Sequence, residues 1–180
     1  MVKLNCFRNL KAKRREISMD KKNHKSWIEK LHESNGLPKV SEITESMSKR
    51  WGEGTLVIPA PEEVYEIMAS VLKGKLLTIS EVRKILAKKH NATISCPLTT
   101  GIFAWISANA AEEEVEKGIK KKPIPYWRTL KTGGELNEKY PGGVDAQAKH
   151  LEKEGFTIIP AKGKKSPIVK DYEKYLMKYD

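Results

Sequence analysis

The sequence predicts a mainly α-helical fold with small β elements and a basic helical extension at the N-terminus. Apolar residues recur at helical spacing between residues 61 and 112, and two of the helices they predict follow each other closely, as in a helix-turn-helix. Short apolar runs bounded by glycine or proline predict the strands. Of the net charge of +11, residues 1–50 hold +7, from 13 Lys and Arg against 6 Asp and Glu. We therefore expect an extension over residues 1–54 and a domain over residues 55–180.

The extension is expected to contain two short helices. Trp27, Ile28 and Leu31 lie on one face of the first helix. Glycine and proline at 36–38 end it, and the second helix is expected from about residue 41 to 50. A glycine-containing turn then leads into the domain.

The domain is expected to open with a short apolar run at 56–58 and a helix that begins at Pro61. Proline suits the first turn of a helix, and the two glutamates after it favour the positive end of the helix dipole. Gly74 ends this helix. Thr78 and Glu81 then form a capping-box pattern that opens the next helix.

A further helix begins at Pro97 and carries Leu98, Ile102 and Trp105 at helical spacing. Residues 78–112 therefore predict a helix, a short turn and a second helix, an arrangement in which the second helix can enter a DNA groove. An ordinary αα-hairpin fits the same pattern and remains an alternative.

Charged runs follow the last of these helices. The acidic run at 112–114 indicates a solvated helix end, and Lys120, Lys121 and Lys122 are placed to meet phosphates of a nucleic acid. The basic balance of the whole chain fits a polyanionic partner, although a simply lysine-rich protein fits it as well.

The C-terminal third is expected to contain a helix over 144–154, ended by Gly155, and then a β-hairpin. The hairpin strands are predicted from the apolar runs at 156–159 and 167–169. A terminal helix that carries several tyrosines is expected after residue 171.

Three pieces of the second half carry a family resemblance: Pro-Tyr-Trp-Arg at 125–128, Tyr-Pro-Gly-Gly at 140–143, and the segment from Lys149 to Gly155. In this order and spacing they resemble the active-site half of the methylated-DNA–protein-cysteine methyltransferases, in which the first piece has the sequence Pro-Cys-His-Arg. The resemblance covers roughly residues 56–156 and implies a winged helix-turn-helix-like alkyltransferase DNA-binding domain.

The reactive residues of that family are replaced here. Tyr126 stands at the cysteine position and Trp127 at the histidine position, while Glu154 stands at the glutamate position. A phenol with a pKa near 10 stays neutral at pH 7, and an indole accepts no proton. The resemblance therefore implies a non-catalytic, alkyltransferase-like member, without cofactor or metal, that makes no cysteine adduct. Cys96 is expected to be a buried structural residue and Cys6 to be incidental.

The resemblance also implies two sets of site residues. A pocket for a damaged or modified base that is flipped out of the duplex would be formed by Pro125, Tyr126, Trp127, Tyr140, Pro141, Gly142 and Glu154. Contacts to double-stranded DNA would come from Leu98, Thr99, Thr100, Gly101, Lys120, Lys121, Lys122 and Arg128. Core packing of Tyr126 and Trp127, with no pocket left, remains an alternative. Leu98 stands where the family wedges an arginine into the duplex, and it would act as an apolar wedge or belong to the core.

Three functions remain open. The first is a DNA-binding protein that senses damaged bases and involves other repair proteins. The second is a base-excising enzyme on the same scaffold, in which Glu154 or Asp145 would activate a water molecule. The third is a protein-interaction domain that uses the C-terminal tyrosines, Tyr172, Tyr175 and Tyr179. No apolar run approaches the roughly 18 residues of a membrane helix, so we expect no membrane partner and a cytoplasmic location.

Overall fold

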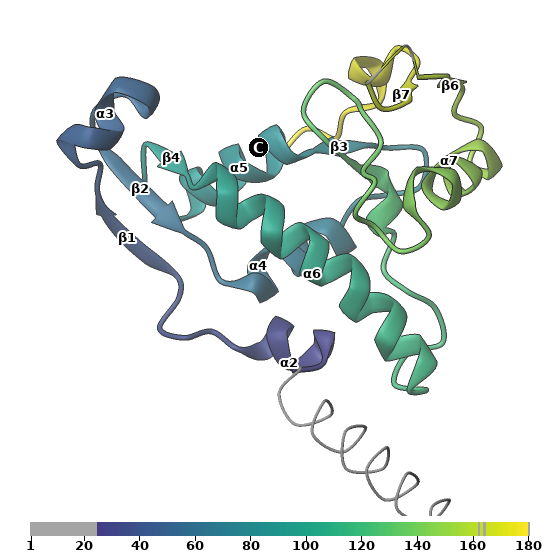
Figure 1. The fold of residues 1–180 in the computed structure, drawn as a ribbon, viewed down its shortest axis with the longest axis horizontal. Helices are drawn as coiled ribbons and strands as arrows, with labels where there is room; N and C mark the ends of the chain where they lie inside the picture. Colours follow the sequence, from purple (N-terminus) through teal and green to yellow (C-terminus); the bar gives the residue numbers. More distant parts are fainter. Residues whose placement is uncertain (1–24, 162, 164, 180) are drawn as a thin grey trace, which may run out of the picture.

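The computed structural model of the chain describes residues 25–161, 163 and 165–179 (Figure 1). Cys6 and residues 1–24 of the predicted basic extension lie outside the described residues. The structure is mixed α/β, with small sheets. Its helices are α2 (Trp27–His32), α3 (Glu45–Trp51), α4 (Pro61–Ala69), α5 (Ile79–Lys89), α6 (Pro97–Glu116) and α7 (Gly143–Lys153), with 3-10 helices η1 (Tyr126–Arg128) and η2 (Tyr172–Tyr175). Its strands are β1 (Lys39–Glu42), β2 (Thr55–Ile58), β3 (Leu77–Thr78), β4 (Ile94–Ser95), β5 (Thr129–Leu130), β6 (Ile158–Ile159) and β7 (Ile168–Val169).

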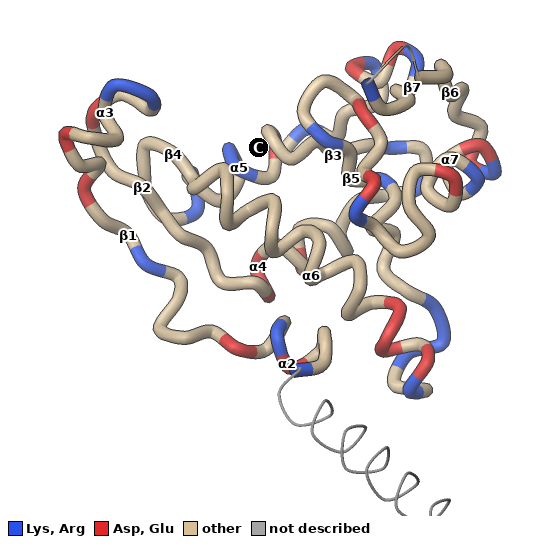
Figure 2. Tube along the Cα trace, in the orientation of Figure 1, with Lys and Arg blue, Asp and Glu red and all other residues tan. Residues whose placement is uncertain are grey.

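Helix α6 runs through the centre of the molecule, between α2 on one side and α7 with the β6–β7 hairpin on the other (Figure 1). Residues 97–111 of this helix carry no charged side chain, and acidic residues gather at its C-terminal end (Figure 2). Alanine and serine at its buried positions let α4 and α2 approach closely. The main core cluster forms where these three helices meet, around residues such as Met68, Leu31 and Ala108.

The predicted helix starts of the domain are confirmed. Pro61 occupies the first turn of α4, and the side chain of Glu63 accepts a hydrogen bond from the backbone N–H of Ala60 at 3.0 Å. Thr78 caps α5 by accepting from the N–H of Glu81. The turn after α5 leads through β4 directly into α6, so the expected helix, turn and helix are present.

Three small sheets complete the fold. In the first, β1 pairs antiparallel with β2, in a register that matches Lys39 with Ile58, and β2 pairs parallel with β4. In the second, β3 pairs parallel with β5. The third is the predicted hairpin of β6 and β7, which is confirmed. A second apolar cluster packs beneath the last two sheets, formed by Leu76, Leu130, Leu136, Leu151, Phe156 and Val169.

Three predicted elements differ from the structure. Helix α4 ends at Ala69, with Ser70 as its C-cap, and so stops before the predicted end at Gly74. The helix expected from residue 41 begins only at Glu45, because residues 39–42 extend along β2 and pair with it. The terminal helix is reduced to one 3-10 turn, η2, because the next residues extend beside β3. There Leu76 donates its N–H to the carbonyl of Tyr175 and accepts from the N–H of Met177, each at 2.9 Å.

The described part of the extension packs against the domain. Leu31 of α2 is buried in the main core cluster, and the Trp27 ring meets Trp105 of α6 edge to face at 4.8 Å between centroids. The boundary at residue 54 stays a prediction about independent folding. No helix in the described ranges is long and apolar enough to span a membrane.

Leu31→Ala tests whether α2 belongs to the core. Removing this buried side chain should lower the free energy of unfolding by about 2–5 kcal/mol, as is usual for a leucine that leaves a cavity. The measurement is urea denaturation followed by circular dichroism. Leu72→Ala, at a side chain that is 65% exposed, is the matched control and should be nearly neutral. Equal stability of the two variants would show that α2 folds apart from the domain.

Candidate nucleic-acid interface

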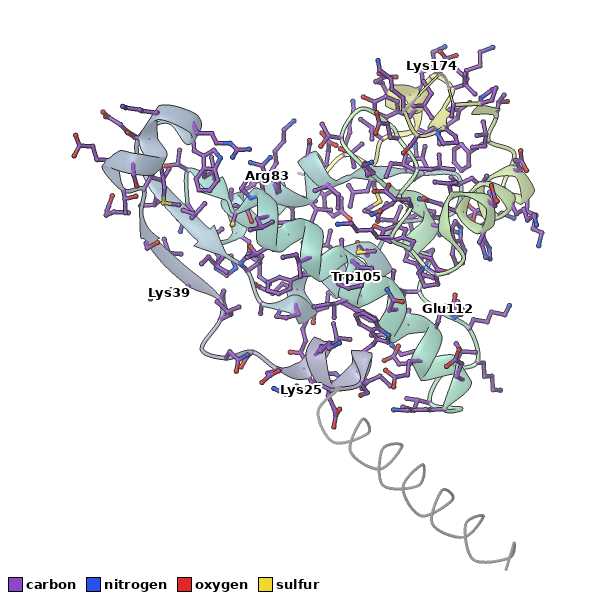
Figure 3. The ribbon with its side chains drawn as sticks, in the orientation of Figure 1. Lys25, Lys39, Arg83, Trp105, Glu112 and Lys174 are labelled. Carbon is purple, nitrogen blue, oxygen red and sulfur yellow. The ribbon has the colours of Figure 1, made fainter. Side chains whose placement is uncertain are left out.

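The aromatic residues expected to line a base pocket lie inside the protein. The side chains of Tyr126 and Tyr140 are each only 2% exposed, and their rings meet edge to face with centroids 5.6 Å apart. The hydroxyl of Tyr126 donates to the carboxylate of Glu112 of α6 at 2.7 Å (Glu112 is labelled in Figure 3). Burial, and then this hydrogen bond, raise the pKa of Tyr126 far above its ordinary value. The phenol is therefore held protonated at neutral pH. Core packing, the alternative for Tyr126 and Trp127, describes Tyr126, whereas Trp127 is half-buried.

Glu154 is the centre of a second buried arrangement. Its carboxylate accepts from Nε and Nη2 of Arg128 at 2.9–3.1 Å and from the indole N–H of Trp127 at 2.8 Å. The remaining guanidinium nitrogen of Arg128 donates to the carbonyl of Val71 at 2.6 Å. Burial raises the pKa of Glu154, but the hydrogen bonds from Arg128 and Trp127 outweigh it and hold that pKa below its ordinary value.

This arrangement gives two predicted site residues a structural role. The guanidinium of Arg128 is engaged inside the fold by Glu154 and by the carbonyl of Val71, and its contact with phosphates of DNA stays a prediction. Glu154 is a fully paired carboxylate, which makes it a weak proton acceptor. The indole of Trp127 also stacks on His150, with ring centroids 4.3 Å apart and planes at 16°.

The Pro-Gly-Gly step after Tyr140 starts helix α7. Pro125 and Pro141 are half-buried, whereas Gly142 is exposed and has the left-handed φ of 71°. A Cβ at Gly142 would lie 2.5 Å from the Cβ of Ala146, so only glycine fits this turn. The predicted pocket residues thus come together in space, with Tyr126 and Tyr140 buried and Gly142 exposed, and their contact with a base stays a prediction.

The first turns of α6 present apolar side chains to solvent. Leu98 is 69% exposed and Ile102, four residues later on the same face, is 40% exposed. Leu98 is therefore a surface residue and does not belong to the core. Thr99 and Gly101 are half-buried, and Thr100 is fully buried, where its hydroxyl donates to the carbonyl of Cys96 at 2.8 Å.

A cavity of about 430 Å³ lies beside these turns. It is bounded by α6, by the start of α5 and by the loop after β5. Its lining residues are Ile79, Pro97, Leu98, Gly101, Ile102, Trp105, Lys131, Thr132, Asn137, Glu138 and Lys139. The loop residues were not expected from the sequence, because no local pattern indicates that residues 131–139 fold back against α6.

Buried amides fix the loop wall of this cavity. The side-chain carbonyl of Gln147 accepts from the N–H of Asn137 at 2.7 Å, and its NH₂ group donates to the carbonyl of Trp127 at 2.9 Å. Lys131 makes ion pairs with Glu135 and Glu138 at 3.4 and 3.2 Å, whereas Lys139 is exposed at the rim. The positive end of the α6 dipole adds to the charge of Lys139 at this surface.

The predicted lysine contacts lie at the other end of α6. Twenty residues of helix place them about 30 Å from Leu98. Nζ of Lys120 donates to the hydroxyl of Tyr65 at 2.6 Å and lies 3.0 Å from the carboxylate of Glu114. Lys121 and Lys122 are exposed, and their contact with DNA stays a prediction.

Cys96 is buried at the start of α6, as predicted. Among the residues whose positions are described, no group of three or more His, Cys, Asp and Glu side chains could hold a metal ion.

Two solved structures of S. pombe proteins are similar to this chain. One is Atl1 in complex with damaged DNA containing O6-carboxymethylguanine, at 17% sequence identity and a TM-score of 0.43. The other is ATL in complex with DNA, at 16% identity and a TM-score of 0.41. Each comparison covers 66% of this chain and 94% of the other chain. No protein-family model and no curated protein matches the sequence.

Glu154→Gln tests the buried ion pair. The substitution should lower the free energy of unfolding by about 3 kcal/mol near pH 7, because Arg128 loses its counter-charge. The pKa of Glu154 is lower in the folded protein than in the unfolded chain, so its stabilisation is present above the ordinary value of 4.5 and is lost as pH falls through the folded value. Urea denaturation at a series of pH values should show the two proteins converging as the solution becomes more acidic than this.

Asp171→Asn is the control for this experiment, because it removes one partner of an exposed ion pair with Lys174. It should leave stability almost unchanged at every pH. A difference between Glu154→Gln and wild type that does not vary with pH would contradict an ionised Glu154 in the folded protein.

Proposed function

We propose that this protein binds double-stranded DNA through the first turns of α6 and recognises damaged or modified bases, without alkyl transfer. One observation carries the proposal. A large apolar side chain, Leu98, projects into solvent from the second helix of a helix-turn-helix, directly beside a cavity of about 430 Å³. Exposed apolar side chains that insert between base steps are a known means of unstacking DNA.

The cavity supports the idea that an extruded base lodges next to Leu98. Its volume falls in the range of about 300–1,000 Å³ that small-molecule sites occupy. Its lining combines apolar side chains of α6 with polar residues of the loop, among them Thr132 and Asn137. Such a site could stack on a base and also bond to its edge. The base site that we propose is therefore this cavity, and not the space around the buried Tyr126.

The absence of alkyl transfer is supported by the chemistry of the residues nearby. The Tyr126 phenol is buried, neutral and bonded to Glu112. Cys96 is buried at the helix start, away from solvent. The excision alternative has less support, because the Glu154 carboxylate is occupied by Arg128 and Trp127.

Leu98→Ala should weaken binding to duplexes that carry a modified base by about tenfold, because most of a leucine side chain would no longer be buried on binding. The measurement is fluorescence anisotropy on a panel of duplexes, each with one different modified base, at several salt concentrations. In a further duplex, 2-aminopurine takes the place of the modified base. Its fluorescence should increase when wild-type protein is added, and should increase less when the Leu98→Ala variant is added. Intact-mass measurement after incubation should show no added alkyl group on the protein.

Leu72→Ala is the matched control, because Leu72 is 65% exposed and lies outside the cavity lining. It should bind every duplex as wild type does. The proposal fails if Leu98→Ala and Leu72→Ala are indistinguishable on the whole panel, or if wild type does not bind DNA at any salt concentration.

Tyr126→Leu distinguishes the cavity from the aromatic cluster as the base site. The change removes an aromatic face and keeps an apolar side chain, so we expect stability to fall while DNA affinity stays within about twofold of wild type, measured below the melting temperature. A base that stacks on Tyr126 would instead lose about 1–3 kcal/mol of stacking, a loss of fivefold or more. Such a loss in folded protein would return the pocket to Tyr126.

A further inference from the structure

A second and larger hollow lies on the other side of α5. It is a groove of about 930 Å³ between α5 and the C-terminal segment 173–179. Its lining residues are Glu81, Lys84, Ile85, Lys88, Lys89, Glu173, Leu176, Met177, Lys178 and Tyr179. We call it the α5–tail groove.

The helix wall of the groove is one continuous stripe. Residues 81, 84, 85 and 88 recur at the spacing of a single helix face, over a length of about 10 Å. Ile79, which lines the cavity beside α6, lies on a different face of α5 from this stripe. The two hollows share no lining residue, so a ligand in one does not occupy the other.

The tail wall of the groove is fixed in place. The backbone of Met177 donates to the carbonyl of Leu76 at 2.9 Å, and the hydroxyl of Tyr179 lies 2.7 Å from the hydroxyl of Ser70. A groove held by such bonds is formed before any partner arrives, which lowers the entropic cost of binding.

The groove combines an apolar floor with a basic rim. Ile85, Leu176 and Met177 supply the floor. Four lysines stand at the rim against two glutamates, so its formal net charge is +2. Two of the lysines have acidic partners, since Lys84 pairs with Glu81 at 3.3 Å and Lys89 with Glu63 at 2.8 Å.

We propose that the α5–tail groove binds an acidic, amphipathic peptide segment of a partner protein. Apolar side chains of the peptide cover the floor, and its carboxylates meet the rim lysines. A short amphipathic helix laid in a groove is a common mode of peptide recognition, and two turns match the length of the α5 stripe. Charge complementarity selects acidic over basic segments.

Two other occupants fit less well. A DNA backbone would satisfy the lysines, but it would bury Ile85, Leu176 and Met177 against charged phosphates. The other is the N-terminal segment of this chain. Its first 24 residues carry 8 Lys and Arg against 2 Asp and Glu, so their net charge of +6 would be repelled by the basic rim. The inference stands independently of the proposed function, because it uses no residue of the cavity beside α6.

The test begins with a selection of displayed random peptides of about 12 residues on the full chain. Peptides with Asp or Glu interleaved with Leu, Ile or Phe should be enriched. A synthetic, fluorescein-labelled copy of an enriched peptide should bind with anisotropy that saturates. The double charge reversal Lys88→Glu with Lys178→Glu should weaken this binding by about tenfold or more. Amide NMR shifts on peptide addition should concentrate in residues 81–89 and 173–179.

Lys153→Glu with Lys170→Glu is the matched control, because it makes the same charge change at exposed lysines that line neither hollow. It should leave peptide binding within about twofold of wild type. The inference is overturned if no acidic peptide is enriched, or if both double variants weaken binding equally. It is also overturned if a DNA duplex displaces the peptide, because the lysines would then be phosphate contacts.

Failure of the proposed function would look different. Loss of DNA binding by wild type, with peptide binding intact, contradicts the DNA proposal and leaves the groove. Retained DNA binding with no peptide enrichment contradicts the groove alone.

Discussion

Three consecutive glutamates near the C-terminal end of α6 tie three other segments to the central helix. Successive positions on a helix point about 100° apart, so each carboxylate faces a different neighbour. Glu112 accepts from the hydroxyl of Tyr126 in η1, and Glu113 accepts from the backbone N–H of Ile28 in α2. Glu114 accepts from the hydroxyl of Tyr65 in α4 and pairs with Lys120. Acidic groups oppose the dipole at this end of a helix, and these partners offset the cost.

The elements that depend on local signals could be predicted from the sequence. Pro61, Thr78 and Pro97 mark helix starts through their own backbone and side-chain chemistry, and the structure has helices there. Elements set by distant contacts could not be predicted. Residues 39–42 form a strand because β2 offers its edge, and the tail extends because Leu76 binds it. The acidic run at 112–114 was predicted to be a solvated helix end, and this prediction is wrong. The residues that bind these carboxylates lie up to 85 positions away in the sequence, so no local pattern indicates them.

The candidate site shows the same division. A family resemblance assigns residues to positions in the chain, but side-chain volume decides whether space remains there. Tyrosine and tryptophan at 126 and 127 are larger than cysteine and histidine, and the structure packs them against Tyr140 and His150. The open volume lies instead beside Leu98, where a loop brought back by Gln147 forms the second wall. The contact between Asn137 and Gln147 joins residues ten positions apart, and no helical or strand periodicity in the sequence indicates it.

The buried position of Tyr126 limits what one substitution there could do. A cysteine at this position would place a sulfur in a dry interior, where low polarity favours the protonated thiol, and beside an indole that takes no proton. The hydrogen bond to Glu112 would be lost with the phenol, and the smaller side chain would leave a cavity beside Tyr140. A thiol introduced here would therefore lower the stability of the fold without becoming reactive.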